Sequence, residues 1–303
     1  MIFYEVPNAS RTLLWDIEQR AWSGELSALF GVASNYLPQC VASRYEFGEL
    51  PVGESTVPLT VCTGDQSAAL HAFGHVKPGT AYVNIGTGAF LQCIAKELSV
   101  LPKRLLCSVV WADAKNVNYV AEATINGAGS ALHLVACELG VSSQEVKKNL
   151  PVWLNEKVNI PLYLNGVSGL GTPFWVPGFD SKFIGEAEPG KKLVAVIESI
   201  VFLLQVNVQE LRNNKIEINC VVVSGGLSVL DGLCQRIADL SGIPVMRPLQ
   251  TEATAKGLAF LVSGSEQAWT IGENDQFQPG VNSELSARYQ RWRNEFEREL
   301  VDG

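Results

Sequence analysis

Apolar residues recur along this chain in two patterns, one typical of strands and the other of helices. Short apolar runs bounded by glycine or polar residues predict strands, at residues 57–62, 80–85, 89–93, 109–111, 119–121, 218–223 and 243–246. Apolar residues at helical spacing predict helices, at residues 66–73, 127–139, 193–212, 225–241, 252–263 and within the last thirty residues. Strands and helices alternate in the second half, so the pattern predicts an α/β fold.

Composition and charge exclude several classes of partner. The 303 residues allow two domains, and 47% hydrophobic residues with 18% charged residues supply a well-buried core. Lys+Arg 23 against Asp+Glu 31 gives a net charge of −8 without any block of like charges. Such a surface offers no basic stripe for a phosphate backbone or an anionic membrane, so neither nucleic acid nor membrane is expected as a partner.

The cysteines and the apolar runs indicate where the protein works. Its seven cysteines are an odd number without any CxxC pair, and most lie within apolar runs. This pattern predicts reduced, buried thiols in a cytoplasmic protein rather than disulfides or a zinc site. No basic-then-apolar leader precedes residue 20, and the longest apolar stretches fall short of the roughly eighteen residues that span a bilayer.

The most specific local motif is Val221-Val222-Val223-Ser224-Gly225-Gly226, a predicted buried strand that ends in paired glycines and opens a helix. Backbone without side chains lets a ligand approach the helix N-terminus, whose free N–H groups favour polar or anionic ligands. A tight strand-to-helix turn explains the same residues equally well. Both interpretations stay open at this point.

Two weaker motifs carry further candidate chemistry. Thr63-Gly64-Asp65-Gln66 follows a strand and could present Asp65 as a base, although an Asp after Gly is more often a turn or helix cap. Gly86-Thr87-Gly88 could hold a phosphate through its N–H groups, yet between two strands it is most often a hairpin turn. The three histidines lack the spacing of metal ligands, so no metal site is predicted.

Taken in order, six motifs resemble the FGGY family of carbohydrate kinases, and within it most closely the glycerol kinases. The resemblance covers nearly the whole chain and rests on Asn8-Ala9-Ser10-Arg11-Thr12-Leu13-Leu14, Gly64-Asp65-Gln66-Ser67-Ala68-Ala69-Leu70, Gly86-Thr87-Gly88-Ala89-Phe90, Leu170-Gly171-Thr172-Pro173-Phe174-Trp175, Ser224-Gly225-Gly226 and Glu252-Ala253-Thr254-Ala255. It implies an actin-like ATPase or ribonuclease-H-type fold in which ATP, Mg²⁺ and an acceptor alcohol meet in a cleft between two lobes.

The resemblance also implies roles for individual residues. Asp65 is the expected general base for the acceptor hydroxyl, Gln66 holds substrate hydroxyls, and Phe90 packs against the carbon chain of the substrate. The residues expected to bind ATP are Gly86, Thr87 and Gly88 at the phosphates, and Gly129, His133, Gly225, Gly226 and Leu230 around the ribose and adenine. His133 and Leu230 depart from the family, which usually has Gln and Asn there.

The family's opening Asp-x-Gly-Thr phosphate loop does not occur in this chain. We therefore expect residues 1–74 to be a remnant of the N-terminal substrate and phosphate lobe, with an apolar patch facing the absent part. Residues 75–303 are expected to be the C-terminal nucleotide-binding domain. The partner expected is a second copy of the chain or a chain that supplies the first lobe.

Three functions remain in competition. The first is ATP-dependent phosphorylation of a small polyol or sugar such as glycerol, with a ketopentose as the alternative acceptor, and with the chain inactive until the first lobe is present. The second is a non-catalytic nucleotide-binding half-kinase. A purely structural protein would account for the glycines as turns but not for six motifs in order.

Overall fold

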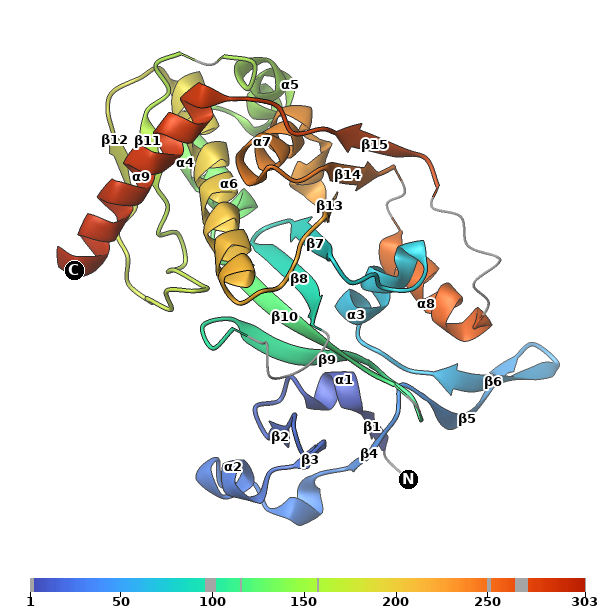
Figure 1. Cartoon of the computed structure of the whole chain (residues 1–303). Coiled ribbons are helices and arrows are strands. Elements are labelled where there is room, and N and C mark those ends of the chain that lie inside the picture. The colour runs from blue at the N-terminus through green and yellow to red at the C-terminus, as the bar shows by residue number, and fades with distance from the viewer. Residues whose placement is uncertain are drawn as a thin grey trace.

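The computed structural model describes residues 3–95, 102–114, 116–156, 158–249, 252–264 and 272–302. Its centre is a seven-stranded sheet with the strand order β15-β14-β13-β7-β8-β10-β9 (Figure 1). These strands are β7 (Thr80–Ile85), β8 (Ala89–Ala95), β9 (Leu106–Ala112), β10 (Val117–Ile125), β13 (Cys220–Ser224), β14 (Val245–Pro248) and β15 (Asn274–Phe277). β13 runs parallel to β7 and β14, whereas the other neighbours are antiparallel. The sheet is therefore mixed, and the expected α/β fold is confirmed.

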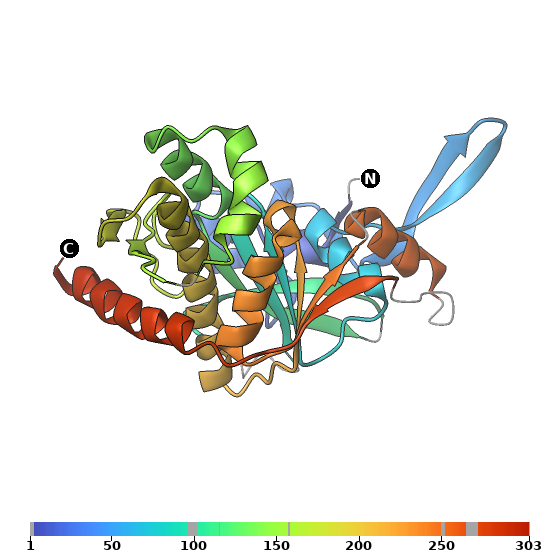
Figure 2. The same cartoon turned by 90° about the horizontal axis from the view of Figure 1, so that it is seen from above.

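One face of the sheet is covered by helices and forms the main hydrophobic core. These helices are α4 (Gly129–Glu138), α6 (Pro189–Asn213) and α7 (Asp231–Ser241), with α5 (Ser143–Trp153) packed on α4 and α6 (Figures 1 and 2). Alternate residues of the strands point into this core, for example Ala121, Ala123 and Ile125 of β10. The pattern follows from the two-residue period of a strand.

Helix α6 is the longest helix after residue 100 and lies in the middle of this layer. By length and composition α6 could cross a membrane, which corrects the expectation that every apolar stretch is too short. In the fold, however, 89% of the most apolar segment of α6 is buried, as expected for the core helix of a globular domain.

The opposite face of the sheet is only partly covered. Helix α3 (Asp65–Leu70), the short helix η2 (His71–Phe73) and α8 (Ala253–Ser263) pack together over it. A side chain at Gly257 would place its Cβ 1.8 Å from the carbonyl oxygen of Ala68, so glycine permits the close approach of α8 to α3. The part of this face beside α3 and α8 stays open and forms the site described below.

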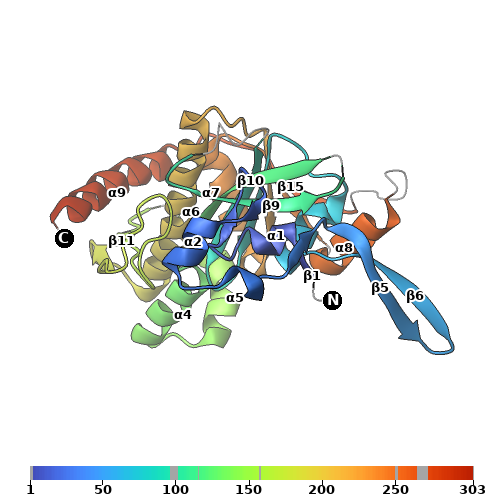
Figure 3. The ribbon, with the colours of Figure 1, turned by 90° about the horizontal axis from the view of Figure 1, so that it is seen from below.

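The first sixty residues form several small elements instead of one sheet. They are β1 (Phe3–Glu5), α1 (Val6–Ala9), β2 (Trp15–Asp16), β3 (Ala21–Trp22), α2 (Gly24–Leu29), η1 (Ser34–Tyr36), β4 (Gln39–Val41), β5 (Arg44–Val52) and β6 (Ser55–Val61). The strands pair as β1–β4, β2–β3 and β5–β6. The hairpin β5–β6 projects away from the body of the molecule (Figures 2 and 3). Large apolar side chains are exposed here, among them Leu13, Leu29, Phe30 and Tyr36.

The C-terminal helix α9 (Ser283–Asp302) packs against the main core near the pair β11 (Leu162–Leu164) and β12 (Lys182–Ile184). Trp292 is fully buried there and donates from its indole nitrogen to the carbonyl of Tyr163 at 2.9 Å. This confirms the expected amphipathic terminal helix.

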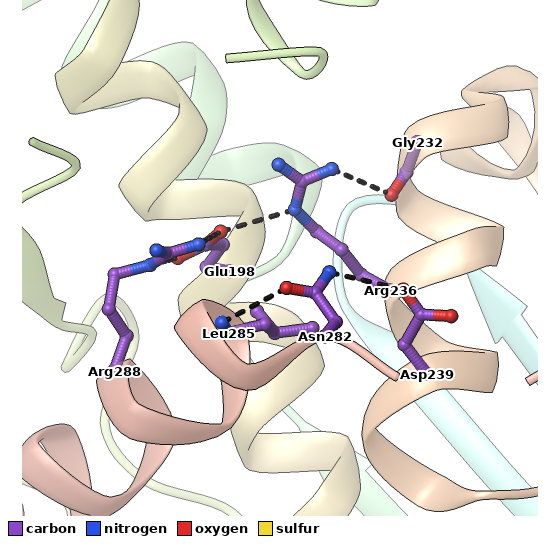
Figure 4. A network of polar contacts seen from close by, with 7 residues as sticks. All are labelled: Glu198, Gly232, Arg236, Asp239, Asn282, Leu285 and Arg288. Carbon is purple, nitrogen blue, oxygen red and sulfur yellow. Dashed lines mark hydrogen bonds and ion pairs between the residues drawn. The ribbon is translucent and has the colours of Figure 1, made fainter. Parts of the chain in front are cut away.

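A buried charge cluster ties three helices together. Glu198 of α6, 1% exposed, accepts hydrogen bonds from Arg236 of α7 and Arg288 of α9 (Figure 4). Nε of Arg236 lies 3.2 Å from the carboxylate, and Nε and one terminal nitrogen of Arg288 lie 2.8 and 2.7 Å from it. One carboxylate thus neutralises part of the charge of two guanidinium groups and fixes α7 and α9 on α6.

Two sequence expectations need correction. The single helix expected at 225–241 is divided, because Leu230 adopts an extended backbone between the short helix η4 (Gly226–Val229) and α7. All seven cysteines are free, as expected, but the prediction that they are buried is confirmed only for Cys93 and Cys234. Cys62 and Cys137 are exposed, and Cys40, Cys107 and Cys220 are partly exposed.

Candidate functional site

A cleft of about 820 Å³ opens on the uncovered face of the sheet. It is lined by the first turn of α3, by side chains from β7, β8 and β13, by η4, and by the start of α8. The parallel strands β7 and β13 end at this place, and ligands of open α/β sheets bind beyond the carboxyl ends of such strands. The topology therefore puts the motifs of several distant segments around one cavity.

Asp65 stands at the rim of the cleft as the first residue of α3. Gly64 is the residue before the helix and has an extended backbone, so Asp65 itself is not the N-cap. The Asp65 side chain is exposed, and its Oδ1 accepts from the N–H of Gln66 at 2.7 Å. Thr254 of α8 donates its hydroxyl to the Asp65 carbonyl at 3.3 Å and so joins the start of α3 to α8. A carboxylate placed here is open to a ligand in the cleft.

The floor of the cleft is built by rows of side chains that cross the sheet. Phe90 of β8 pairs with Asn84 of β7, which pairs with Ser224 of β13. Asn84 donates its amide to the Ser224 hydroxyl at 3.2 Å, and Phe90 is 42% exposed. An exposed aromatic ring on a polar floor offers an apolar contact to a ligand's carbon chain.

The paired glycines after β13 have different roles. Gly225 has φ +92°, and a Cβ there would lie 2.6 to 2.8 Å from backbone atoms of Ile85. Glycine is therefore required at 225 by the fold itself. Gly226 is exposed, lines the cleft and has no atom within 4 Å of where its Cβ would be. The turn interpretation explains Gly225, whereas Gly226 leaves space in the cleft that the fold does not need.

The Gly86–Gly88 segment is a hairpin turn that also caps a helix. Gly86 donates its N–H to the carbonyl of Gly88 at 2.8 Å. The N–H of Gly129 donates to the carbonyl of Gly86 at 2.9 Å, and those of Ala128 and Ser130 both donate to the carbonyl of Thr87 at 3.0 Å. The first two amides of α4, those of Gly129 and Ser130, are thus already satisfied by this turn.

The structure brings the three glycine motifs together by backbone contact. Gly225 touches Ile85, Gly129 touches Gly86, and a Cβ at Gly88 would lie 2.8 Å from the carbonyl oxygen of Ile125. Among the predicted site residues, Asp65, Gln66, Phe90, Gly225 and Gly226 line the cleft. Four others, at the hairpin turn and the start of α4, are not among its lining residues: Gly86, Thr87, Gly88 and Gly129.

The two positions that depart from the family lie elsewhere. His133 is exposed on α4, where its Nε2 is 3.8 Å from the sulfur of Cys137. Leu230 is 7% exposed and belongs to the main hydrophobic core. Neither lines the cleft, and their expected contacts with the nucleotide remain predictions.

Sequence reasoning missed Arg247 and Gln92, which also line the cleft. Arg247 of β14 is 2.8 Å from Asp231 and 2.6 Å from Asp275, so two carboxylates balance its charge. The sequence gives no sign that Arg247 belongs to a site, because its partners Asp231 and Asp275 are distant from it along the chain. No group of three His, Cys, Asp or Glu side chains that could hold a metal is found in the described part of the chain.

Comparison with known proteins identifies the architecture. The profile described as "FGGY family of carbohydrate kinases, C-terminal domain" matches residues 81–263. A glycerol kinase of Rhodopirellula baltica is 32% identical over 313 residues, which cover 97% of this chain and 58% of the relative. A glycerol kinase of Halothermothrix orenii is 29% identical over 304 residues, covering 94% and 61%. The chain therefore spans about three fifths of the length of the curated relatives it matches.

Solved structures show the same fold. A xylulose kinase from Brucella ovis superposes with a TM-score of 0.84 at 22% identity, covering 99% of this chain and 66% of that one. A Plasmodium falciparum glycerol kinase solved with ADP gives a TM-score of 0.83 at 22% identity, covering 98% and 63%. Both are kinases of the actin-like fold expected from the sequence.

Proposed function

Because the chain belongs to the FGGY family of carbohydrate kinases, we propose that its cleft binds ATP and takes part in phosphoryl transfer to a hydroxyl of a small polyol or sugar. The observation that carries the proposal is the joining of two features in one cavity. The carboxylate of Asp65 is exposed at one wall, and the unfilled space beside Gly226 lies at another. Glycerol is the acceptor favoured by the curated relatives, and a ketopentose is the alternative.

In this proposal the chain's own groups position the reactants. ATP supplies the phosphoryl group, with its adenosine beside Gly225 and Gly226 and its phosphates toward the turn Gly86–Gly88. Gly226 suits this, because a side chain there would fill the approach to the backbone, whereas Gly225 is glycine because the fold requires it. Mg²⁺ is proposed to enter with the phosphates, because in kinase sites it is held largely by the oxygens of the substrate phosphates.

Asp65 is proposed as the general base. Phosphoryl transfer depends mainly on positioning and charge stabilisation, so one carboxylate that accepts the proton of the acceptor hydroxyl is chemically sufficient. Gln66 is proposed to hold neighbouring hydroxyls of the acceptor, and Phe90 to pack on its carbon atoms. Each of these side chains lines the same cleft.

We also propose that turnover requires the part of the relatives that this chain does not match. The proposal assigns residues 1–74 to the first lobe and residues 75–303 to the nucleotide-binding domain. The exposed side chains of Leu29, Phe30 and Tyr36 belong to residues 1–74 and support a contact with the rest of that lobe, supplied by a longer chain, a separate chain or a second copy. Work in the cytoplasm is proposed from the seven free thiols.

A second candidate is a nucleotide-binding half-kinase without catalysis. The two candidates share the nucleotide site and differ in turnover.

Titration of ATP tests the nucleotide site. Gly226→Trp fills the open side of the cleft, and we expect it to weaken ATP binding at least about tenfold without lowering stability. Gly178→Trp is the matched control, because Gly178 also has no atom within 4 Å of its Cβ position, is exposed and lies outside the cleft lining. Equal ATP affinity in folded Gly226→Trp and Gly178→Trp proteins would remove the nucleotide from this cleft.

A further inference from the structure

We infer that Gln92 determines which alcohol the cleft binds, because its side-chain oxygen accepts a hydrogen bond from a hydroxyl of that alcohol. The alcohol we infer is a linear polyol or open-chain ketose longer than glycerol. The inference rests on the proposed function of the cleft. It goes beyond that function because it names the residue and the substrate class.

The amide of Gln92 is held in one orientation by a buried carboxylate. Gln92 of β8 pairs across the sheet with Glu122 of β10 and donates its Nε2 to Oε1 of Glu122 at 2.5 Å. Glu122 is 5% exposed and also accepts both terminal nitrogens of Arg11, at 2.5 and 3.1 Å. An ionised carboxylate only accepts hydrogen bonds, so the nitrogen of the Gln92 amide must face it.

The oxygen of the same amide is left for the cleft. Gln92 is 8% exposed and lines the cavity, and none of the described residues donates a hydrogen bond to its Oε1. Its other neighbour across the sheet is Tyr82, followed in the same row by Val222. Gln92 therefore provides a fixed hydrogen-bond acceptor on an otherwise mainly apolar stretch of the floor. A ligand that covers Oε1 without donating to it loses the hydration of that oxygen and binds more weakly.

The position of Gln92 indicates the length of the ligand. Phe90 and Gln92 stand two residues apart on the same face of β8, so their Cβ atoms are about 7 Å from each other along the strand. An acceptor held by Asp65 and packed on Phe90 must continue along the floor to reach Oε1 of Gln92. A ligand that contacts both Phe90 and Gln92 must span this spacing, which a four- or five-carbon chain does more readily than a three-carbon triol.

The N-terminal motif gains a function from this arrangement. Arg11, in the Asn8–Leu14 motif, is a positioning residue, because it acts through Glu122 on the amide of Gln92. Arg11, Glu122 and Gln92, from three separated segments, thus together orient one hydrogen-bond acceptor, Oε1 of Gln92.

Ligand-observed NMR on the whole chain tests the inference, with glycerol, erythritol and xylitol as the probes. We expect the protein to bind xylitol more tightly than glycerol. Gln92→Leu should weaken xylitol binding about tenfold, the effect of one lost hydrogen bond to a buried acceptor, and change glycerol binding less than about twofold. Gln276→Leu is the matched control, because Gln276 is exposed on β15 outside the cleft lining. Gln92→Met, with an unbranched side chain of similar length, replaces Gln92→Leu if that variant does not fold.

The outcomes separate the inference from the proposed function. Xylitol binding that falls in the Gln92 variant and stays unchanged in the control supports the inference. Polyol binding with the same preference in wild-type and Gln92→Leu proteins overturns the inference alone. Absence of binding for all three polyols overturns both the inference and the proposed acceptor site, while ATP titration tests the nucleotide site independently.

Discussion

Replacement of Glu198 by glutamine should strongly destabilise the protein. Glu198 is 1% exposed, and its carboxylate is the shared partner of Arg236 and Arg288. The two arginines are 7% and 8% exposed. Glutamine has nearly the same shape, so the change removes the negative charge and one acceptor without opening a cavity. Figure 4 shows the Glu198 carboxylate between the two guanidinium groups, which in the variant keep their charge without it.

The expected magnitude follows from the cost of breaking a buried ion pair. Removing one partner typically costs about 3–5 kcal/mol, because the remaining buried charge loses its counter-charge. For a chain of this size we expect the midpoint of thermal unfolding to fall by roughly 6–20 °C. Loosening of α7 and α9 from α6 should accompany the loss, since the cluster links these three helices.

Denaturant unfolding of matched variants measures the effect. Glu186→Gln is the control, because Glu186 is 93% exposed and pairs with Lys192 at 3.0 Å, so its loss should cost less than about 1 kcal/mol. In a double-mutant cycle, Arg288→Leu should partly relieve the effect of Glu198→Gln, because it removes one of the two buried guanidinium charges that the carboxylate had balanced. A Glu198→Gln protein within 1 kcal/mol, or about the measurement error, of wild type would refute the reasoning.

Two further predictions concern the layer that carries Asp65. Burial, together with the nearby His75, lowers the pKa of His71 from 6.5 to about 4. The folded protein therefore resists protonation of His71, and its free energy of unfolding should fall by roughly 3 kcal/mol as the pH drops from 6.5 to 4. His71→Leu should flatten this pH dependence in unfolding experiments. Gly257→Ala should lower the free energy of unfolding by about 1–3 kcal/mol and weaken acceptor binding, because its Cβ would lie 1.8 Å from the carbonyl oxygen of Ala68 in α3. Gly178→Ala is the control. Equal unfolding curves for the two variants would show that α8 and α3 are not tightly packed.

The sheet could be predicted where burial leaves a pattern in the sequence. β13 is covered on both faces at its centre and reads as a continuous apolar run, and β7 and β8 are separated by a glycine turn. β15 (Asn274–Phe277) and β5 were missed, because an edge strand and a solvent-exposed hairpin need no apolar alternation. Helix α5 had a signal that was overlooked, since Ser142 caps the N–H of Glu145 three residues later.

The site was predictable as a set of motifs but not as a geometry. The order of motifs singled out Asp65, Gln66, Phe90 and the glycines, and the structure places five of these residues around one cleft. Sequence alone could not separate Gly225, which the fold requires, from Gly226, which leaves space for a ligand. Gln92 gave no signal either, because a lone polar residue in an apolar strand acquires its meaning from Glu122 on the neighbouring strand.

The central claim is that this cleft supports phosphoryl transfer with Asp65 as the base. It is tested most directly by measuring the turnover of Asp65→Asn in a protein that combines this chain with the first lobe of a kinase relative. We predict nearly unchanged ATP and polyol binding, with turnover lowered about 10²–10⁴-fold. Asp180→Asn, an exposed position outside the cleft lining, should leave turnover unchanged. Near-normal turnover in the Asp65→Asn protein would contradict the account and place the base on another residue.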